Sequence, residues 1–175
     1  LNKAKSEGAD VIFTPVSIAY AVQIITQAAS LGIEAPFLGS DTLDDNMVLE
    51  AIKGTDLQLY VSTFYQEGGA PEFDTGVKEY INASSEALAG NDTISAVTAM
   101  GYDAYFVALE AMKKADSGDK AAIMAALPSV TYTGVSGAIA FDAQGDAIRD
   151  TAYIKAADTA SGAWVLETVQ TGSGS

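Results

Sequence analysis

The first third of the chain alternates short apolar runs with stretches whose apolar residues recur at helical spacing. Val11-Ile12-Phe13 is a β-rich run that indicates a strand buried on both faces. From Ser17 to Leu31 the apolar residues recur every three or four positions, and Gly32 follows as a helix-ending residue. A strand at 36–39, a helix at 45–53 and a strand at 57–63 are expected next. This order predicts an α/β domain with a parallel, doubly wound sheet.

The rest of the chain is mainly helical and then changes to turns and strands. Helices are expected at 72–88, 96–115 and 119–127, and strands at 138–141, 152–156 and 163–169. A turn near Ser161-Gly162 joins the last two strands as a hairpin. Residues 171–175 contain only Gly, Ser and Thr, which is typical of a flexible tail or linker.

Charge and composition exclude several classes of function. Nine Lys and Arg residues against 23 Asp and Glu residues give a net charge of −14, which would repel a phosphate backbone, so we expect no nucleic-acid partner. The chain has no Cys and no His. Thiolate and imidazole metal sites and a Ser-His-Asp triad are therefore absent. We expect no enzymatic activity, no metal and no cofactor.

Three stretches carry a resemblance to a known family. They are SEGADVIF (6–13) with QAASLGI (27–33) and PFLGSD (36–41), then AMGYDA (99–104) with LEAMKKA (109–115), then YTGVSG (132–137) with FDAQGD (141–146). In this order and spacing they resemble the substrate-binding proteins of branched-chain amino acid ABC transporters, which are type I periplasmic binding proteins of the leucine-binding class.

The resemblance implies a fold of two doubly wound α/β lobes joined by a hinge, present here as its second half. Residues 1–63 would belong to lobe two, 64–148 to lobe one, and 149–170 would return to lobe two. The implied function is capture of an amino acid or similar small polar metabolite by cleft closure, for delivery to an ABC permease. The implied location is extracytoplasmic, either in the periplasm or as a cell-surface lipoprotein of a Gram-positive bacterium. The chain would pair with the missing N-terminal half or with a second copy, or else expose considerable apolar surface.

Candidate ligand-binding residues follow two strands, where open α/β sheets bind ligands. Asp41 matches a family position whose acidic residue takes the α-amino group of the ligand. The alternative is that Asp41 only caps the next helix, although Asp44 and Asp45 are better candidates for that cap. Thr42 lies in the same loop.

Ser17 and Ile18 follow the first strand. Ser17 matches a cleft-lining family position that is often aromatic, so a serine there weakens the case for a branched-chain ligand; alternatively Ser17 is only a helix N-cap. Backbone groups of Ile18, at the helix N-terminus, suit an anionic group of the ligand. By resemblance, Val97 and Thr98 approach the ligand side chain.

Two other functions remain open from the sequence. The same fold could serve as the ligand-sensing domain of a receptor or regulator. A magnesium-dependent α/β enzyme would use Asp41, Asp44 and Asp45 as a cation cluster, but no phosphate-cradling glycine loop and no convincing general base are present.

Overall fold

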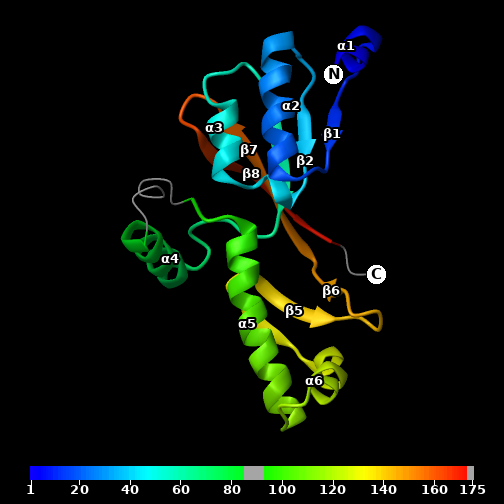
Figure 1. The fold of residues 1–175 in the computed structure, drawn as a ribbon, viewed down its shortest axis with the longest axis vertical. Coiled ribbons are helices and arrows are strands. Elements are labelled where there is room, and N and C mark those ends of the chain that lie inside the picture. Colours follow the sequence, from blue (N-terminus) through cyan, green and yellow to red (C-terminus); the bar gives the residue numbers. More distant parts are fainter. Residues whose placement is uncertain (85–92, 173–175) are drawn as a thin grey trace.

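The computed structural model describes residues 1–84 and 93–172 and shows an elongated molecule with two groups of elements (Figure 1). The upper lobe contains α1 (Asn2–Glu7), β1 (Ile12–Thr14), α2 (Ile18–Leu31), β2 (Phe37–Gly39), η1 (Asp41–Leu43), α3 (Asn46–Ile52), β3 (Leu59–Thr63), β7 (Thr151–Asp158) and β8 (Ala163–Thr171). The lower lobe contains α4 (Pro71–Ser84), α5 (Ala96–Ala115), α6 (Lys120–Ala126), η2 (Leu127–Ser129), β4 (Tyr132–Gly134), β5 (Gly137–Phe141) and β6 (Ala147–Ile148). No helix within the described ranges is long and apolar enough to cross a membrane.

The upper lobe is built on a five-stranded sheet with the order β1-β2-β3-β7-β8. Strands β1, β2 and β3 are parallel, and the hairpin β7–β8 adds two antiparallel strands at the β3 edge. This confirms an α/β fold with a parallel-containing sheet. The antiparallel hairpin makes that sheet mixed, because the chain leaves β3 for the lower lobe and re-enters the sheet from the opposite direction.

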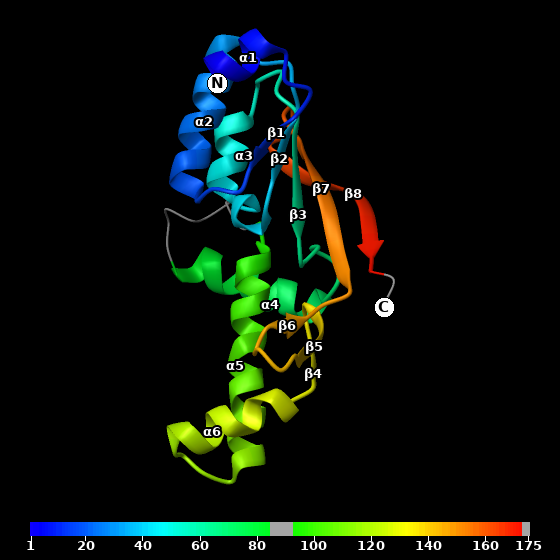
Figure 2. The same ribbon diagram turned by 90° about the vertical axis from the view of Figure 1, so that its right-hand side faces the viewer.

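The core of the upper lobe lies on one face of the sheet. Figure 2 shows α2 and α3 on the same side of the strands. Side chains of these helices, such as Ile25 and Val48, are buried against Phe37, Leu59 and Val61 of the sheet. Burial of this kind stabilises by about 25 cal/mol for each Å² of apolar surface removed from water. This face therefore holds the lobe together.

The opposite face of the sheet is largely uncovered, and this corrects the expectation that the first strand is buried on both sides. Phe13 is 68% exposed. It lies in one row across the sheet with Leu38, Tyr60, Ala156 and Val165. The prediction failed because the apolar pattern of a strand reports which residues can be buried, whereas burial requires an element on that face, and the helices of this lobe lie on the other.

Most helix limits agree with the sequence patterns. The helix expected at 96–115 is α5, whose N-cap Ser95 accepts a hydrogen bond from the amide of Thr98 at 3.4 Å. The helix expected at 72–88 begins at Pro71 and is described to Ser84; its remaining residues lie outside the described part of the chain. The short strands β4 and β6 and the 3₁₀ turn η1 were not expected, because two or three residues carry no periodic signal.

A buried carboxylate joins α5 to the turn between β4 and β5. Asp103 is fully buried and accepts hydrogen bonds from the amides of Val135 at 2.9 Å and Ser136 at 2.8 Å, and from the Ser136 hydroxyl at 2.5 Å. The Arg149 guanidinium donates to the Ser136 carbonyl at 3.0 Å and lies 5.4 Å from the ring centroid of Phe64. Because Phe64 follows β3 and Arg149 precedes β7, the two segments that connect the lobes touch each other.

Gly134 has no room for a side chain beside this carboxylate. A Cβ atom at this position would overlap the carboxylate of Asp103. We expect Gly134→Ala to lower the free energy of unfolding by about 2 kcal/mol, since overpacking of a filled site typically costs 1–3 kcal/mol. Gly101→Ala is the matched control, because a Cβ there meets open space in a helix and should add up to about 1 kcal/mol of stability. Urea denaturation of both variants and of the parent chain tests this prediction. A Gly134→Ala variant as stable as the parent would show that the site beside Asp103 can accommodate a methyl group.

Candidate functional site

The loops that follow β1 and β2 lie side by side at the carboxyl edge of the parallel strands. The Thr42 hydroxyl donates to the carbonyl oxygen of Val16 at 2.9 Å and lies 2.8 Å from the Ser40 hydroxyl. These contacts join the loop before α2 to η1. The structure therefore brings Ser17, Ile18, Asp41 and Thr42 to one edge of the sheet.

Asp41 and Ser17 present polar groups at this edge. Asp41 is partly exposed, and within the described part of the chain no group is hydrogen-bonded to its carboxylate. Ser17 is exposed and occupies the N-cap position of α2, but its side chain makes no capping hydrogen bond. Ile18 is the half-buried first residue of α2, where backbone amides have no partner inside the helix.

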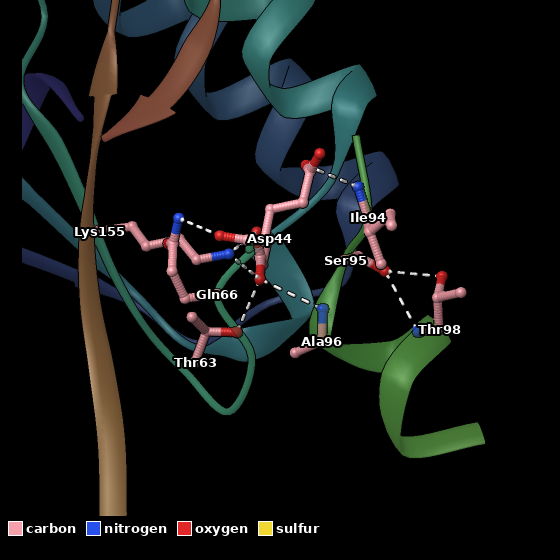
Figure 3. A network of polar contacts seen from close by, with 9 residues as sticks. Asp44, Thr63, Gln66, Ile94, Ser95, Ala96, Thr98 and Lys155 are labelled. Atoms are coloured by element: carbon pink, nitrogen blue, oxygen red, sulfur yellow. Dashed lines mark hydrogen bonds and ion pairs between the residues drawn. The ribbon is translucent and has the colours of Figure 1, made fainter. Parts of the chain in front are cut away.

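The two other acids of this loop are already engaged. Asp45 is the N-cap of α3 and accepts a hydrogen bond from the amide of Met47 at 2.8 Å, as expected for a cap. Asp44 is not a cap. Its carboxylate is buried and lies 3.0 and 3.2 Å from the ammonium of Lys155 (Figure 3). The carboxylate also accepts hydrogen bonds from the Thr63 hydroxyl at 2.7 Å and from the amide of Ala96 at 3.3 Å.

This geometry gives no support to the magnesium cluster of Asp41, Asp44 and Asp45. The Asp44 oxygens are occupied by a lysine ammonium, a hydroxyl and an amide, which leaves them unsuited to a cation. Among the residues described, no group of three acids is arranged to hold a metal ion.

Val97 and Thr98 lie in the first turn of α5, and both are exposed. The hydrogen bond from Ala96 to Asp44 holds this turn against the upper lobe (Figure 3). The Thr98 hydroxyl lies 3.3 Å from that of Ser95, so part of its hydrogen-bonding capacity is used within the helix cap. The Val97 side chain is 57% exposed. All six candidate residues therefore lie either at the edge of the parallel strands or on the helix turn held next to it.

Sequence reasoning missed the Lys155–Asp44 pair. The signal was one lysine inside an otherwise apolar and aromatic strand, Tyr153–Ala157, where a charged side chain is buried only with a partner. Thr63, at the end of β3, adds a hydrogen bond to Asp44, and nothing in the sequence pattern indicated this role.

Tyr65, two residues after Thr63 along the chain, is fully buried. Its hydroxyl donates to a carboxylate oxygen of Asp74 at 2.5 Å, and the amide of Gly68 donates to the other at 2.7 Å. Burial, followed by the hydrogen bond to Asp74, raises the pKa of Tyr65 well above its ordinary value. Tyr65 is thus fully buried, whereas the preceding residue, Phe64, is half-buried under Arg149.

Because the pKa of Tyr65 is raised in the folded chain, the protein should lose stability at alkaline pH. The unfolded chain releases this proton near its ordinary pKa of about 10, whereas the folded chain keeps it, so the free energy of unfolding falls as pH rises above about 10. We expect Tyr65→Phe to flatten this decline, measured by urea denaturation from about pH 8 to about pH 12. Tyr20→Phe, at an exposed position, should leave the decline unchanged. Equal declines in Tyr65→Phe and the unsubstituted chain would contradict the assignment.

Comparison with known proteins gives the same fold. The sequence profile of the family described as periplasmic binding protein matches residues 1–163. A leucine-binding protein from Thermotoga maritima superposes with a TM-score of 0.76 at 26% identity, over 97% of this chain and 47% of that protein. No match was found among curated proteins.

Two further solved structures show the fold at lower identity. A branched-chain amino acid binding protein from Streptococcus pneumoniae, in complex with isoleucine, has a TM-score of 0.68 at 21% identity over 93% of this chain and 44% of that one. A solute-binding protein from R. palustris, in complex with benzoate, has a TM-score of 0.75 at 18% identity over 98% and 46%. The chain thus spans about half the length of these proteins. The match over residues 1–163 shows that the chain belongs to the periplasmic binding protein family.

Proposed function

We propose that this chain is part of the solute-binding component of an ABC importer, and that it binds an amino acid or a similar small polar metabolite. The observation that supports this most directly is the carboxylate of Asp41. Of the three acids in its loop, Asp44 and Asp45 are engaged by protein groups, whereas Asp41 is partly exposed at the strand edge and has no hydrogen-bonding partner in the described chain. An unpaired carboxylate at such an edge suits a ligand ammonium.

The other candidate residues complement this assignment. In the proposal, the first-turn amides of α2 at Ile18 receive the ligand carboxylate, because they carry the positive end of the helix dipole. The exposed hydroxyls of Ser17 and Thr42 add hydrogen bonds at the same edge. Val97, with Thr98 beside it, contacts the ligand side chain from the lower lobe.

Function would consist of binding and closure without chemical conversion. The chain crosses between the lobes after β3 and again before β7. Small backbone changes at two such crossings are enough to rotate one lobe toward the other. The closed form would then be bound by an ABC permease, which places the protein outside the cytoplasm.

The binding cleft would be completed by further polypeptide. This chain covers about half of each related protein, and the row from Phe13 to Val165 leaves an apolar sheet face uncovered. We propose a companion that supplies the other half of the family fold, with a second copy of the chain as the alternative. Either would remove apolar surface from water.

A calorimetric and thermal-shift screen tests the function. The chain, alone and with a companion polypeptide that supplies the rest of the family's length, is titrated with the standard amino acids, benzoate and magnesium. Stabilisation by an amino acid supports the proposal. Stabilisation by magnesium alone contradicts it, and a response to benzoate but to no amino acid would replace the amino acid by an aromatic carboxylate.

A further inference from the structure

One contact of the buried network joins the two lobes. Asp44, Thr63 and Lys155 belong to the upper lobe, whereas Ala96 is the first residue of α5 in the lower lobe. We infer that Asp44 is a positioning residue: its carboxylate, fixed by Lys155, holds the first turn of α5 and thereby sets the angle between the lobes. This angle is a property of the chain itself and goes beyond the proposed binding of a solute.

The buried network lies where the chain passes between the lobes. This location favours a role of Asp44 in setting the angle between the lobes over a role confined to the packing of one lobe. Thr63 is the last residue of β3, where the chain leaves the upper lobe, and it is fully buried. The chain just before α5 is held by a second carboxylate, because the amide of Ile94 donates to the carboxylate of Glu67 at 3.3 Å. The start of α5 is therefore held by two carboxylates, that of Glu67 in the connection after β3 and that of Asp44 in the upper lobe.

The charge of Asp44 is needed for this arrangement. Its Oδ2 atom accepts from Lys155, Thr63 and Ala96 together, at 3.0, 2.7 and 3.3 Å. An ionised carboxylate oxygen can serve several donors, and these bonds are stronger than those of a neutral amide. An asparagine has one acceptor oxygen in place of two, and its NH₂ group would face the Lys155 ammonium. Asp44→Asn should therefore release Ala96 from the upper lobe.

The consequence for the candidate site rests on the proposed function. Asp41 precedes Asp44 by three residues, and Val97 follows Ala96 directly. A rotation about the Asp44–Ala96 contact would change the gap between the carboxylate proposed for the ligand ammonium and the side chain proposed for its apolar part. Asp44 would thus act on ligand binding through geometry and without touching the ligand.

The test measures the distance between the lobes and needs no ligand, so it can fail or succeed independently of solute binding. The chain has no cysteine, so Glu50→Cys on α3 and Lys120→Cys on α6, both exposed, give one spin label in each lobe. We expect double electron–electron resonance to show a broader or shifted distance distribution in Asp44→Asn. Asp45→Asn, with the same change of charge one residue later, should match the parent chain. Equal distributions in Asp44→Asn and Asp45→Asn would overturn the inference.

A second variant keeps the test decisive if Asp44→Asn does not fold. Asp44→Leu/Lys155→Met removes both charges and retains apolar volume, so no charge is left buried without a partner. Folding of this variant is checked by circular dichroism. A broadened distribution in the folded double variant supports the inference, and the parent distribution overturns it, because the Ala96 amide has then lost its acceptor without any effect on the lobes.

Discussion

Replacing Lys155 with methionine should lower the free energy of unfolding by about 3–5 kcal/mol, because it leaves the Asp44 carboxylate buried without a counter-charge. The ammonium lies 3.0 Å from Asp44, and the two side chains are 2% and 0% exposed. Desolvation of an unpaired carboxylate is expensive in such a place, whereas methionine fills a similar volume. The free energy of unfolding of a natural domain is only about 5–15 kcal/mol. This single change should therefore remove a large part of the stability.

Two controls separate the charge effect from the loss of packing. Lys113→Met breaks an exposed pair with Glu110 and should change the free energy of unfolding by at most about 0.5–1 kcal/mol. Asp44→Leu/Lys155→Met should recover most of the loss, since neither charge then remains buried. Urea denaturation monitored by circular dichroism gives all three values. A loss in Lys155→Met no larger than in Lys113→Met would show that Asp44 finds compensation elsewhere.

This pair also shows where reading the sequence reaches its limit. Asp44 and Asp45 are adjacent and have the same side chain, yet one lies in the core and the other caps α3. The difference is set by Lys155, which is 111 residues away. Helix caps follow from local order along the chain, but a long-range ion pair depends on which strands become neighbours, and that information is not local.

The elements that were predicted well are those with strong local signals. The limits of α5 were predicted, and the structure shows that the features that fix them are local: the cap Ser95, the apolar positions of the helix and the Lys113-Lys114 pair at its end all lie within one segment. The exposure of Phe13 was not, because it depends on an element that would cover the other face of the sheet. The fold itself was indicated by the order of three stretches that are individually unspecific, which is why the whole chain was needed.

The candidate site combines both kinds of inference. The resemblance selected Asp41 over its neighbours, and its role in binding stays a prediction. The structure adds a physical distinction that the sequence lacked, since the other two acids of the loop are engaged. A carboxylate kept free of protein partners can be tested by a conservative substitution, because little else depends on it.

Asp41→Asn should weaken amino acid binding at least about 30-fold, since truncating one partner of a hydrogen-bonded charge pair costs about 2–5 kcal/mol. The fold should be unaffected, because the Asp41 carboxylate has no hydrogen-bonding partner within the described chain. Isothermal titration calorimetry, with the amino acid identified in the screen, measures the dissociation constant. Asp45→Asn carries the same change of charge and keeps a good capping residue, so its dissociation constant should stay near that of the parent.

The chemical group recognised by Asp41 can be isolated by changing the ligand. An analogue whose ammonium is replaced by hydrogen keeps the carboxylate and the side chain, and it should bind equally weakly to the parent chain and to Asp41→Asn. If Asp41 instead served as a general source of negative potential, the analogue would bind better to Asp41→Asn, because repulsion of its carboxylate would be relieved. If both ligands lost affinity equally in Asp41→Asn, the residue would shape the loop, and the ammonium partner would have to be sought in the polypeptide that completes the cleft.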